Sequence, residues 1–469
     1  MHLKRCITVG GMTKWRGNPW AVLATLSLGF FMTLLDMTIV NIAIPDVMRS
    51  LHTGLDQVVW TVGGYTLVLA VLLVTAARLG DLRGQRTVFA AGVVVFTLAS
   101  AACGLAPDVG TLIAARVVQG VGAALLTPQT MALIIATFPA DRRGTALGVW
   151  GAVAGVATLT GPTLGGTLVS AAGWRWVFLV NIPVGALVLA MTVLVVPDVR
   201  TGRAHRLDLP GVLLSSAALT CLTFALMEGD RYGWNAWIWG LMASGALLGG
   251  LFLRHQAGGQ DREPLIPFEL FQNRGFALMT ALMGVIGAAL IGAVLPLGIF
   301  LQEQLGLSAV HAGLALAPSP LVSLAVSPFA GRMSDRVGGH RVLVAGLLAF
   351  ALGLGLVALL TGGDAHAWTF TAPLMLMGLG TGCMIAPLSA EAMRGVPARL
   401  AGSASGVSNS VRQLGSVLGT AATTALMTVG SPLDGVHLAL ALPIVLLALA
   451  AGALAFTRPR TPAPAATSA

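Results

Sequence analysis

The sequence predicts an all-α polytopic membrane protein, and two observations support that prediction. Of the 469 residues, 56% are apolar and only 10% are charged, and the mean hydropathy is +0.86. A soluble domain averages about 25% charged residues. The apolar residues also gather into runs of roughly 20 residues, the length that a helix needs to cross a bilayer. These features exclude a soluble protein.

Fourteen apolar runs follow one another along the chain. The predicted spans are 20–44, 57–77, 87–106, 109–132, 145–169, 175–196, 210–228, 236–253, 275–300, 311–330, 342–361, 368–390, 402–428 and 437–456. The weakest are 210–228 and 236–253, and without this pair the same pattern gives twelve spans. Either number is even, so both termini are expected on the same side of the membrane.

The basic residues predict the orientation. Of the 27 lysines and arginines, Arg49, Arg175 and Arg231 fall on one side, Arg116 and Arg412 fall inside spans, and the others fall on the side of the termini. Basic loop residues gather on the cytoplasmic side. We therefore expect cytoplasmic termini and a multi-pass protein of the inner, cytoplasmic membrane. Because the basic residues lie between spans, the net charge of +9 does not indicate a nucleic-acid partner.

The sequence shows no sign of enzyme or nucleotide chemistry. Its only lysines, Lys4 and Lys14, follow Leu3 and Thr13, whereas a phosphate-binding loop needs lysine after glycine. The four cysteines lack the spacing of metal ligands or disulfides. We expect no enzyme activity, no cofactor and no bound metal. Any transport would draw its energy from an ion gradient, from the substrate gradient or from a partner subunit.

A short motif occurs twice and indicates an internal duplication. The segments ARLGDLRGQR, at 77–86, and GRMSDRVGGHR, at 331–341, both place an aspartate three residues before a glycine. Duplicated halves are common in secondary transporters, with the substrate site near the bilayer midplane between them. We predict a six-helix bundle over 1–196, a linker with two extra spans over 197–274, and a second six-helix bundle over 275–469.

The two repeated loops contain the residues of a conformational latch. Asp81, Gly84 and Arg86 belong to the first copy, and Asp335 and Gly338 to the second. An aspartate near a helix end can pair with an arginine or accept hydrogen bonds from backbone N–H groups, and glycine permits a tight turn. Such a cluster can hold two helices together in one state and release them in the other.

Asp36 is a lone carboxylate inside the apolar run 20–44. An acid at the centre of a span costs about 2.5–3.5 kcal/mol on insertion scales, so such a residue is a candidate functional site. Because a carboxyl group can bind and release a proton, Asp36 indicates proton coupling.

Four segments together carry a resemblance to a known family. They are LDMTIVNIAIP (35–45), ARLGDLRGQR (77–86), LIAARVVQGVGAA (112–124) and GVATLTGPTLGG (155–166). In this order they resemble the first-helix, loop, fourth-helix and antiporter motifs of the major facilitator superfamily, specifically its fourteen-helix drug:proton antiporter branch. Ala77 stands where the loop motif usually has glycine, whereas the second copy keeps Gly331. The resemblance covers about residues 15–457. It implies the major facilitator fold, with two six-helix bundles and two inserted central helices.

Arg116 is the expected partner of Asp36. Both residues lie seven to eight residues from the outer ends of their spans, roughly 10–12 Å deep. Charges at that depth usually pair or line a water-filled path. A nearby guanidinium favours the ionised carboxylate and its withdrawal favours protonation, which would make a proton switch driven by helix movement. The alternative is a fixed ion pair that only holds helices together.

The fifth predicted span is rich in glycine. Gly155, Gly161, Gly165 and Gly166 would allow close helix packing in a membrane, and Pro162 can bend the helix. A smooth, bendable helix suits a sliding contact between the two halves, which the family resemblance favours. Static close packing is the alternative.

Polar residues within spans are candidates for the lining of a central cavity. Asn409 and Arg412 share one face of the thirteenth span with Ser405 and Ser416, because the spacings are four, three and four. A structural role for Arg412, bonded to neighbouring carbonyls, fits this pattern equally well. The candidate lining residues are Asn41, Gln119, Asn409 and Arg412.

These features together predict a proton-coupled antiporter that exports lipophilic drugs or antibiotics by alternating access. Cationic drugs are included, because Asp36 could attract a cation as well as a proton. The expected partners are a drug-like small molecule, protons and the lipid bilayer, with the protein acting as a monomer. The alternatives are a proton-coupled uptake symporter and a polytopic ligand sensor, although a sensor usually has a cytoplasmic effector domain.

Overall fold

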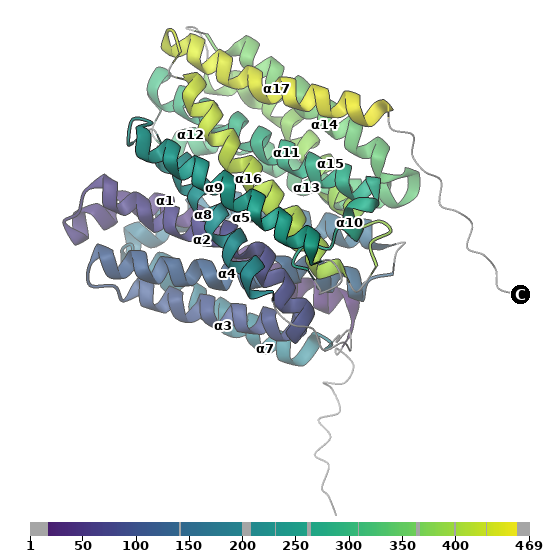
Figure 1. The fold of residues 1–469 in the computed structure, drawn as a ribbon. Helices are drawn as coiled ribbons and strands as arrows, with labels where there is room; N and C mark the ends of the chain where they lie inside the picture. The colour runs from purple at the N-terminus through teal and green to yellow at the C-terminus, as the bar shows by residue number, and fades with distance from the viewer. Residues whose placement is uncertain are drawn as a thin grey trace, which may run out of the picture.

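The computed structural model is built from helices, most of them long (Figure 1). It describes residues 17–139, 142–198, 208–229, 231–259, 264–307, 309–362, 366–397, 400–427 and 429–456. The helices are α1 (Pro19–Leu51), α2 (Leu55–Arg83), α3 (Gln85–Gly104), α4 (Val109–Thr137), α5 (Arg143–Ala172), α6 (Trp176–Leu179), α7 (Asn181–Val195), α8 (Leu209–Glu228), α9 (Ala236–Gly258), α10 (Glu269–Gln272), α11 (Arg274–Ile299), α12 (Ala309–Leu316), α13 (Pro318–Val337), α14 (Gly339–Leu360), α15 (Thr371–Ala392), α16 (Ala401–Met427) and α17 (Pro432–Phe456).

Twelve helical segments within the described residues are long and apolar enough to cross a bilayer, which makes the chain a multi-pass membrane protein. The predicted span 145–169 falls on α5, some side chains of which lie outside the described residues, so the number twelve does not test that span; the predicted span 402–428 falls on α16, which is long but is not among the twelve. For α16 the reason is its polar content, since serine and threonine recur along it and Asn409, Arg412 and Gln413 add to them. The number fourteen therefore stays a prediction.

The long helices form two groups that lie side by side. In Figure 1 the helices up to α7, purple to blue, lie on one side of the molecule, and α11 to α17, green to yellow, lie on the other. Within the first group α3 packs on α4, α2 on α4, and α1 on α5, whereas in the second α14 packs on α15 and α11 on α16. The groups meet where α5 packs against α13 and α2 against α16.

Helices α8 and α9 pack mainly against each other, and one carboxylate links the start of α8 to the end of α9. Asp208 accepts from the backbone N–H of Gly211 at 3.0 Å, contacts Nε2 of His255 at 2.9 Å and accepts from Nε2 of Gln256 at 2.7 Å. Partial burial raises the pKa of this carboxyl, but the hydrogen bonds from His255, Gly211 and Gln256 outweigh it and hold the pKa below its ordinary value. The predicted boundaries at 196 and 274 stay predictions.

Candidate functional site

Asp36 and Arg116 form an ion pair inside the first group of helices. Nη1 of Arg116 donates to Oδ2 of Asp36, and both side chains are 0% exposed. The other carboxylate oxygen, Oδ1, accepts from Nε2 of Gln119 at 2.8 Å and from Nδ2 of Asn181 at 3.2 Å. The predicted partnership of Asp36 with Arg116 is therefore present, with two amides completing the coordination of the carboxylate.

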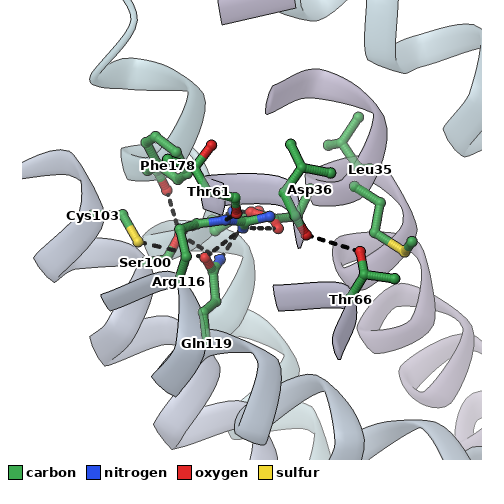
Figure 2. A network of polar contacts seen from close by, with 12 residues as sticks. Leu35, Asp36, Thr61, Thr66, Ser100, Cys103, Arg116, Gln119 and Phe178 are labelled. Carbon is green, nitrogen blue, oxygen red and sulfur yellow. Dashed lines mark hydrogen bonds and ion pairs between the residues drawn. The ribbon is translucent and has the colours of Figure 1, made fainter. Parts of the chain in front are cut away.

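The guanidinium of Arg116 has further partners besides Asp36. Its Nε donates to the carbonyl of Thr61 in α2 at 2.7 Å, and its Nη1 also donates to Oε1 of Gln119 at 2.7 Å. The plane of the Tyr65 ring lies against it, with 4.4 Å from Cζ to the ring centroid. Figure 2 shows these groups converging from neighbouring helices. Such contacts offset the desolvation cost of a buried charge.

A second layer of polar groups orients the two amides. The hydroxyl of Ser100, in α3, accepts from Nε2 of Gln119 at 3.2 Å and from Nδ2 of Asn181 at 3.0 Å, and it donates to the carbonyl of Phe178 at 2.9 Å (Figure 2). Sγ of Cys103 lies 3.6 Å from Oε1 of Gln119. The amide orientations are thus fixed from both sides.

The sequence analysis missed Asn181 and Ser100. Asn181 is the first residue of α7, and the single residue Val180 separates it from α6. The signal was present in the sequence, because Pro183 follows two residues later and proline favours the first turn of a helix. A polar residue next to a helix start in an apolar run indicates a side chain that needs a partner.

The aspartates of the two repeated loops each cap a helix of the opposite group. Asp335, near the end of α13, accepts from the backbone N–H groups of Gly144 at 3.0 Å and Thr145 at 2.9 Å, and from the Thr145 hydroxyl at 2.8 Å. Asp81, near the end of α2, accepts from the backbone N–H of Ser403 at 3.1 Å and from its hydroxyl at 2.7 Å. These contacts stabilise the starts of α5 and α16, where N–H groups lack helical partners.

The remaining loop residues have separate roles. Gly84 and Gly338 follow α2 and α13 with φ of +93° and +91°, a conformation that favours glycine. Nη2 of Arg86 donates to the carbonyl of Val193 in α7 at 2.7 Å, within its own group of helices. Ala77, the departure from the loop motif, faces Gly406 of α16, where an added Cβ would collide with it. The glycine that allows α2 and α16 to approach closely at this point is therefore Gly406 of α16, while α2 has Ala77.

The glycines of α5 pack against two different neighbours. A Cβ added to Gly155 would lie 2.9 Å from the carbonyl oxygen of Pro320 in α13, whereas one added to Gly165 would lie 2.8 Å from Cγ1 of Ile39 in α1. Gly161 faces Thr38, also in α1, and Gly166 meets nothing within 4 Å. The side chain of Pro162 lies outside the described residues. The expectation that the whole motif lies between the halves is therefore wrong in this conformation.

Gly155 is joined at the contact between the two groups by earlier glycines of α5. A Cβ on Gly148 would lie 2.6 Å from the carbonyl oxygen of Ser327, and Gly144 lies against Gly331. Close backbone approach at this end of α5 requires glycine for steric reasons.

The polar face of α16 begins at the other group and continues along the helix. The hydroxyl of Ser405 donates to the carbonyl of Pro128 in α4 at 3.1 Å, and Nδ2 of Asn409 donates to the carbonyl of Ser405 at 2.9 Å. Nη2 of Arg412 lies 3.5 Å from Oδ1 of Asn409. Gln119, predicted as cavity lining, is fully buried in the ion-pair network, and Asn41 is exposed and donates to the carbonyl of Met37 at 3.2 Å.

The fold and its buried charges define a multi-pass helical membrane protein with an ion pair enclosed in one group of helices. The chain belongs to the Major Facilitator Superfamily, whose family model matches residues 26–420 and 278–469. It is 38% identical to the multidrug resistance protein Stp of Mycobacterium tuberculosis over 401 residues, covering 85% of this chain and 74% of that one. It is 35% identical to the tetracenomycin C resistance and export protein of Streptomyces glaucescens, covering 88% and 76% of the two chains.

A solved structure shows the same fold. The crystal structure of the human organic anion transporter MFSD10 matches with a TM-score of 0.69, covering 93% of this chain and 99% of that one. The two sequences are 14% identical, so the likeness concerns the fold alone.

Proposed function

We propose that this protein is a proton-coupled antiporter that exports lipophilic drugs or antibiotics across the cytoplasmic membrane by alternating access. The relatives named for multidrug resistance and for tetracenomycin C export support the export of drug-like molecules. So does the Methylenomycin A resistance protein of Streptomyces coelicolor, at 36% identity. The observation that carries proton coupling is the Asp36–Arg116 pair, because both charges are fully enclosed in protein.

Protonation of Asp36 would destabilise this arrangement. The proton removes the carboxylate charge and leaves Arg116 as a buried cation without its counter-ion. Breaking a buried pair by removing one partner costs about 3–5 kcal/mol. That is enough to shift a two-state equilibrium by more than a hundredfold. The bound proton would therefore favour a conformation in which α1 and α4 lie differently.

The helix packing offers a route from Asp36 to the contact between the two halves. Thr38 and Ile39 follow Asp36 by two and three residues, and they face Gly161 and Gly165 of α5. The opposite end of the same helix is held by Asp335 of α13. A movement of α1 would thus act on α5, and α5 would act on the other half.

The proposed architecture has fourteen spans, with α8 and α9 inserted between two six-helix halves and both termini in the cytoplasm. In that orientation the contacts of Asp81 and Asp335 close the cytoplasmic side. We propose that the protein acts as a monomer. In a variant lacking the native cysteines, Gly233→Cys should react with an impermeant thiol reagent on intact cells and Ala204→Cys should not; the opposite labelling would contradict this topology.

The function can be tested in everted membrane vesicles with an acidic interior. A pH-sensitive dye in the vesicles reports proton release when lipophilic drugs are added, and drug accumulation is measured in parallel. An antiporter should release protons while it accumulates the drug in the vesicle interior. An uptake symporter would move protons and drug out together, and a ligand sensor would move neither. Vesicles containing an equal amount of Asp36→Asn protein are the control for coupling.

A further inference from the structure

Arg412 lies near the middle of the membrane depth, in α16 of the second half of the molecule (the group α11 to α17). It is the twelfth residue of α16, a helix of 27 residues, so it lies about 16 Å from the helix start. The hydrocarbon core is about 30 Å thick. A charge at that depth is costly unless it pairs or lines a path for ions or substrate.

The guanidinium of Arg412 has a single weak protein contact. Nη2 lies 3.5 Å from Oδ1 of Asn409, at the limit of hydrogen bonding. Among the residues that the structure describes, no carboxylate lies within ion-pair distance of Arg412 and no backbone carbonyl accepts from its guanidinium. The structural role in which Arg412 is bonded to carbonyls is therefore not the arrangement found here.

Arg412 lies on the face of α16 that turns toward the other half. Ser405, two helical turns earlier, reaches the carbonyl of Pro128 in α4. Along this face Asn409 is buried, Arg412 is partly buried and Thr420 is exposed. Leu418 is 54% exposed. It lies on the side of α16 opposite to Thr420, because a separation of two residues corresponds to about 200° of rotation around the helix axis. The apolar exposed side suits lipid, so the polar exposed side faces the interior of the transporter.

The charges at mid-depth give this interior face a positive sign. Asp36 is 0% exposed and bound to Arg116, so it offers nothing to a cation in this conformation. Arg412 is left with an unused donor fork, and the guanidinium geometry matches a carboxylate or a similar oxyanion. The expectation of cationic substrates, which relied on Asp36, finds no support in this geometry.

We infer that Arg412 binds an anionic group of the exported substrate, and that the substrates are therefore lipophilic acids with an ionised carboxylate or phenolate. This inference rests on the proposed export function and specifies its substrate class. The apolar body of such a molecule would lie among the apolar side chains between the halves, while its oxyanion occupies the donors of Arg412.

The inference can be tested with three probes that share one apolar body: pyrenebutyrate, pyrenebutanol and pyrenebutylamine. Binding to the purified full-length protein is measured by energy transfer from its 10 tryptophans to pyrene. The parent should bind the carboxylate roughly tenfold or more tightly than the alcohol, as a charge-assisted hydrogen bond would give, and the amine most weakly. Arg412→Gln should lose this preference while it keeps its affinity for the alcohol.

Two further variants separate the explanations. Arg274→Gln removes an exposed arginine at the start of α11 and should keep the full preference for the carboxylate. Arg412→Lys should keep part of it, because the charge remains and the fork is lost. If Arg412→Gln does not yield folded protein, two measurements still test the inference. They are the order of the parent's affinities for the three probes and the size of the preference of Arg412→Lys for the carboxylate over the alcohol.

A parent protein that binds the amine as tightly as the carboxylate would overturn the inference, as would an unchanged preference in Arg412→Gln. Proton-coupled export of cations by such a protein would leave the proposed function intact. Conversely, a preference for the carboxylate without drug-dependent proton movement would support the site and contradict the antiport.

Discussion

Each half of the molecule contains one arginine within a membrane-spanning segment, and the two arginines differ in their partners and in their exposure. In the first half Arg116 is enclosed by Asp36, Gln119 and the Thr61 carbonyl, and its side chain is 0% exposed. In the second half Arg412 is partly exposed and has one contact of 3.5 Å. A charge that is paired with a buried carboxylate suits internal control of conformation, whereas a charge without a carboxylate partner suits an external ligand. The difference suggests a division of labour, with proton chemistry in the first half and substrate recognition in the second.

The two halves are similar at the ends of their helices, although they differ in the surroundings of Arg116 and Arg412. Asp81 and Asp335 occupy matching positions, and each caps a helix of the other half. The two repeated loops thus make equivalent capping contacts, whereas the arginines Arg116 and Arg412 lie in different surroundings. The predictions below test whether this difference follows function.

Replacement of Asp36 should have the largest effect. Asp36→Asn keeps the volume and removes the titratable group, so drug-dependent proton movement should be abolished while the protein still inserts. Asp434→Asn is the matched control, since Asp434 is an exposed carboxylate at the start of α17 in the second half. Proton release from everted vesicles with equal protein amounts is the measurement. If the Asp36→Asn variant still couples drug transport to proton movement, the proton-binding site does not lie at Asp36 in the first half.

Arg116→Lys should be the next most damaging change, because lysine cannot reproduce the fork. The guanidinium donates at once to Asp36, Gln119 and the Thr61 carbonyl, and an ammonium group cannot reach all three with that geometry. We expect a transport rate roughly tenfold lower, equivalent to about 1.4 kcal/mol, and a shifted pH optimum. The pH profile of drug accumulation is the measurement. If the pH profile of the variant matches that of the parent, the Asp36–Arg116 ion pair has only a structural role.

Two glycines of α5 distinguish packing within a half from packing between halves. Gly165 faces Ile39 of the same half, a contact that would persist in every transport state, so Gly165→Leu should lower the yield of folded protein. Gly148 faces the Ser327 carbonyl of the other half. Gly148→Leu should fold well but fail to close that contact, and should lose transport severalfold.

Monodisperse yield in detergent and drug transport should be measured on the same preparation of each variant. Normal folding together with normal transport in Gly148→Leu would mean that the halves do not need this contact. Equal losses of yield in both variants would show that α5 packs in one way throughout the transport cycle.

The sequence predicted the charged pair better than its surroundings. The similar depth of Asp36 and Arg116 was visible in their spans, and the aspartates beside helix ends were recognisable as potential caps. Depth and local pattern are properties of one segment at a time. The sequence does not determine which distant helix an aspartate caps or which neighbour a glycine faces, because these depend on the rotation of each helix within its bundle. Gly165 against α1 and Asp81 against α16 are two such cases.

The polar residues that complete the ion-pair network were also hidden. Asn181 reaches Asp36 because of how α7 is rotated toward α1, and the predicted span 175–196 alone does not determine that rotation. The tertiary arrangement also separated the candidates for cavity lining, since Gln119 is fully buried inside the first half whereas Arg412 is partly exposed on α16.

The latches should give the smallest effect, and a graded one. Asp335 accepts three hydrogen bonds at the start of α5, whereas Asp81 accepts two from Ser403 at the start of α16. Loss of a helix cap costs about 1 kcal/mol, roughly a fivefold shift in a two-state equilibrium. Asp335→Ala should therefore favour separated cytoplasmic ends somewhat more than Asp81→Ala does. Spin labels at exposed positions 83 and 336, in opposite halves, report the separation. If both variants keep the parent distance distribution, the capping contacts do not hold the halves together, and the similarity between the halves at the membrane surface would have no mechanical role.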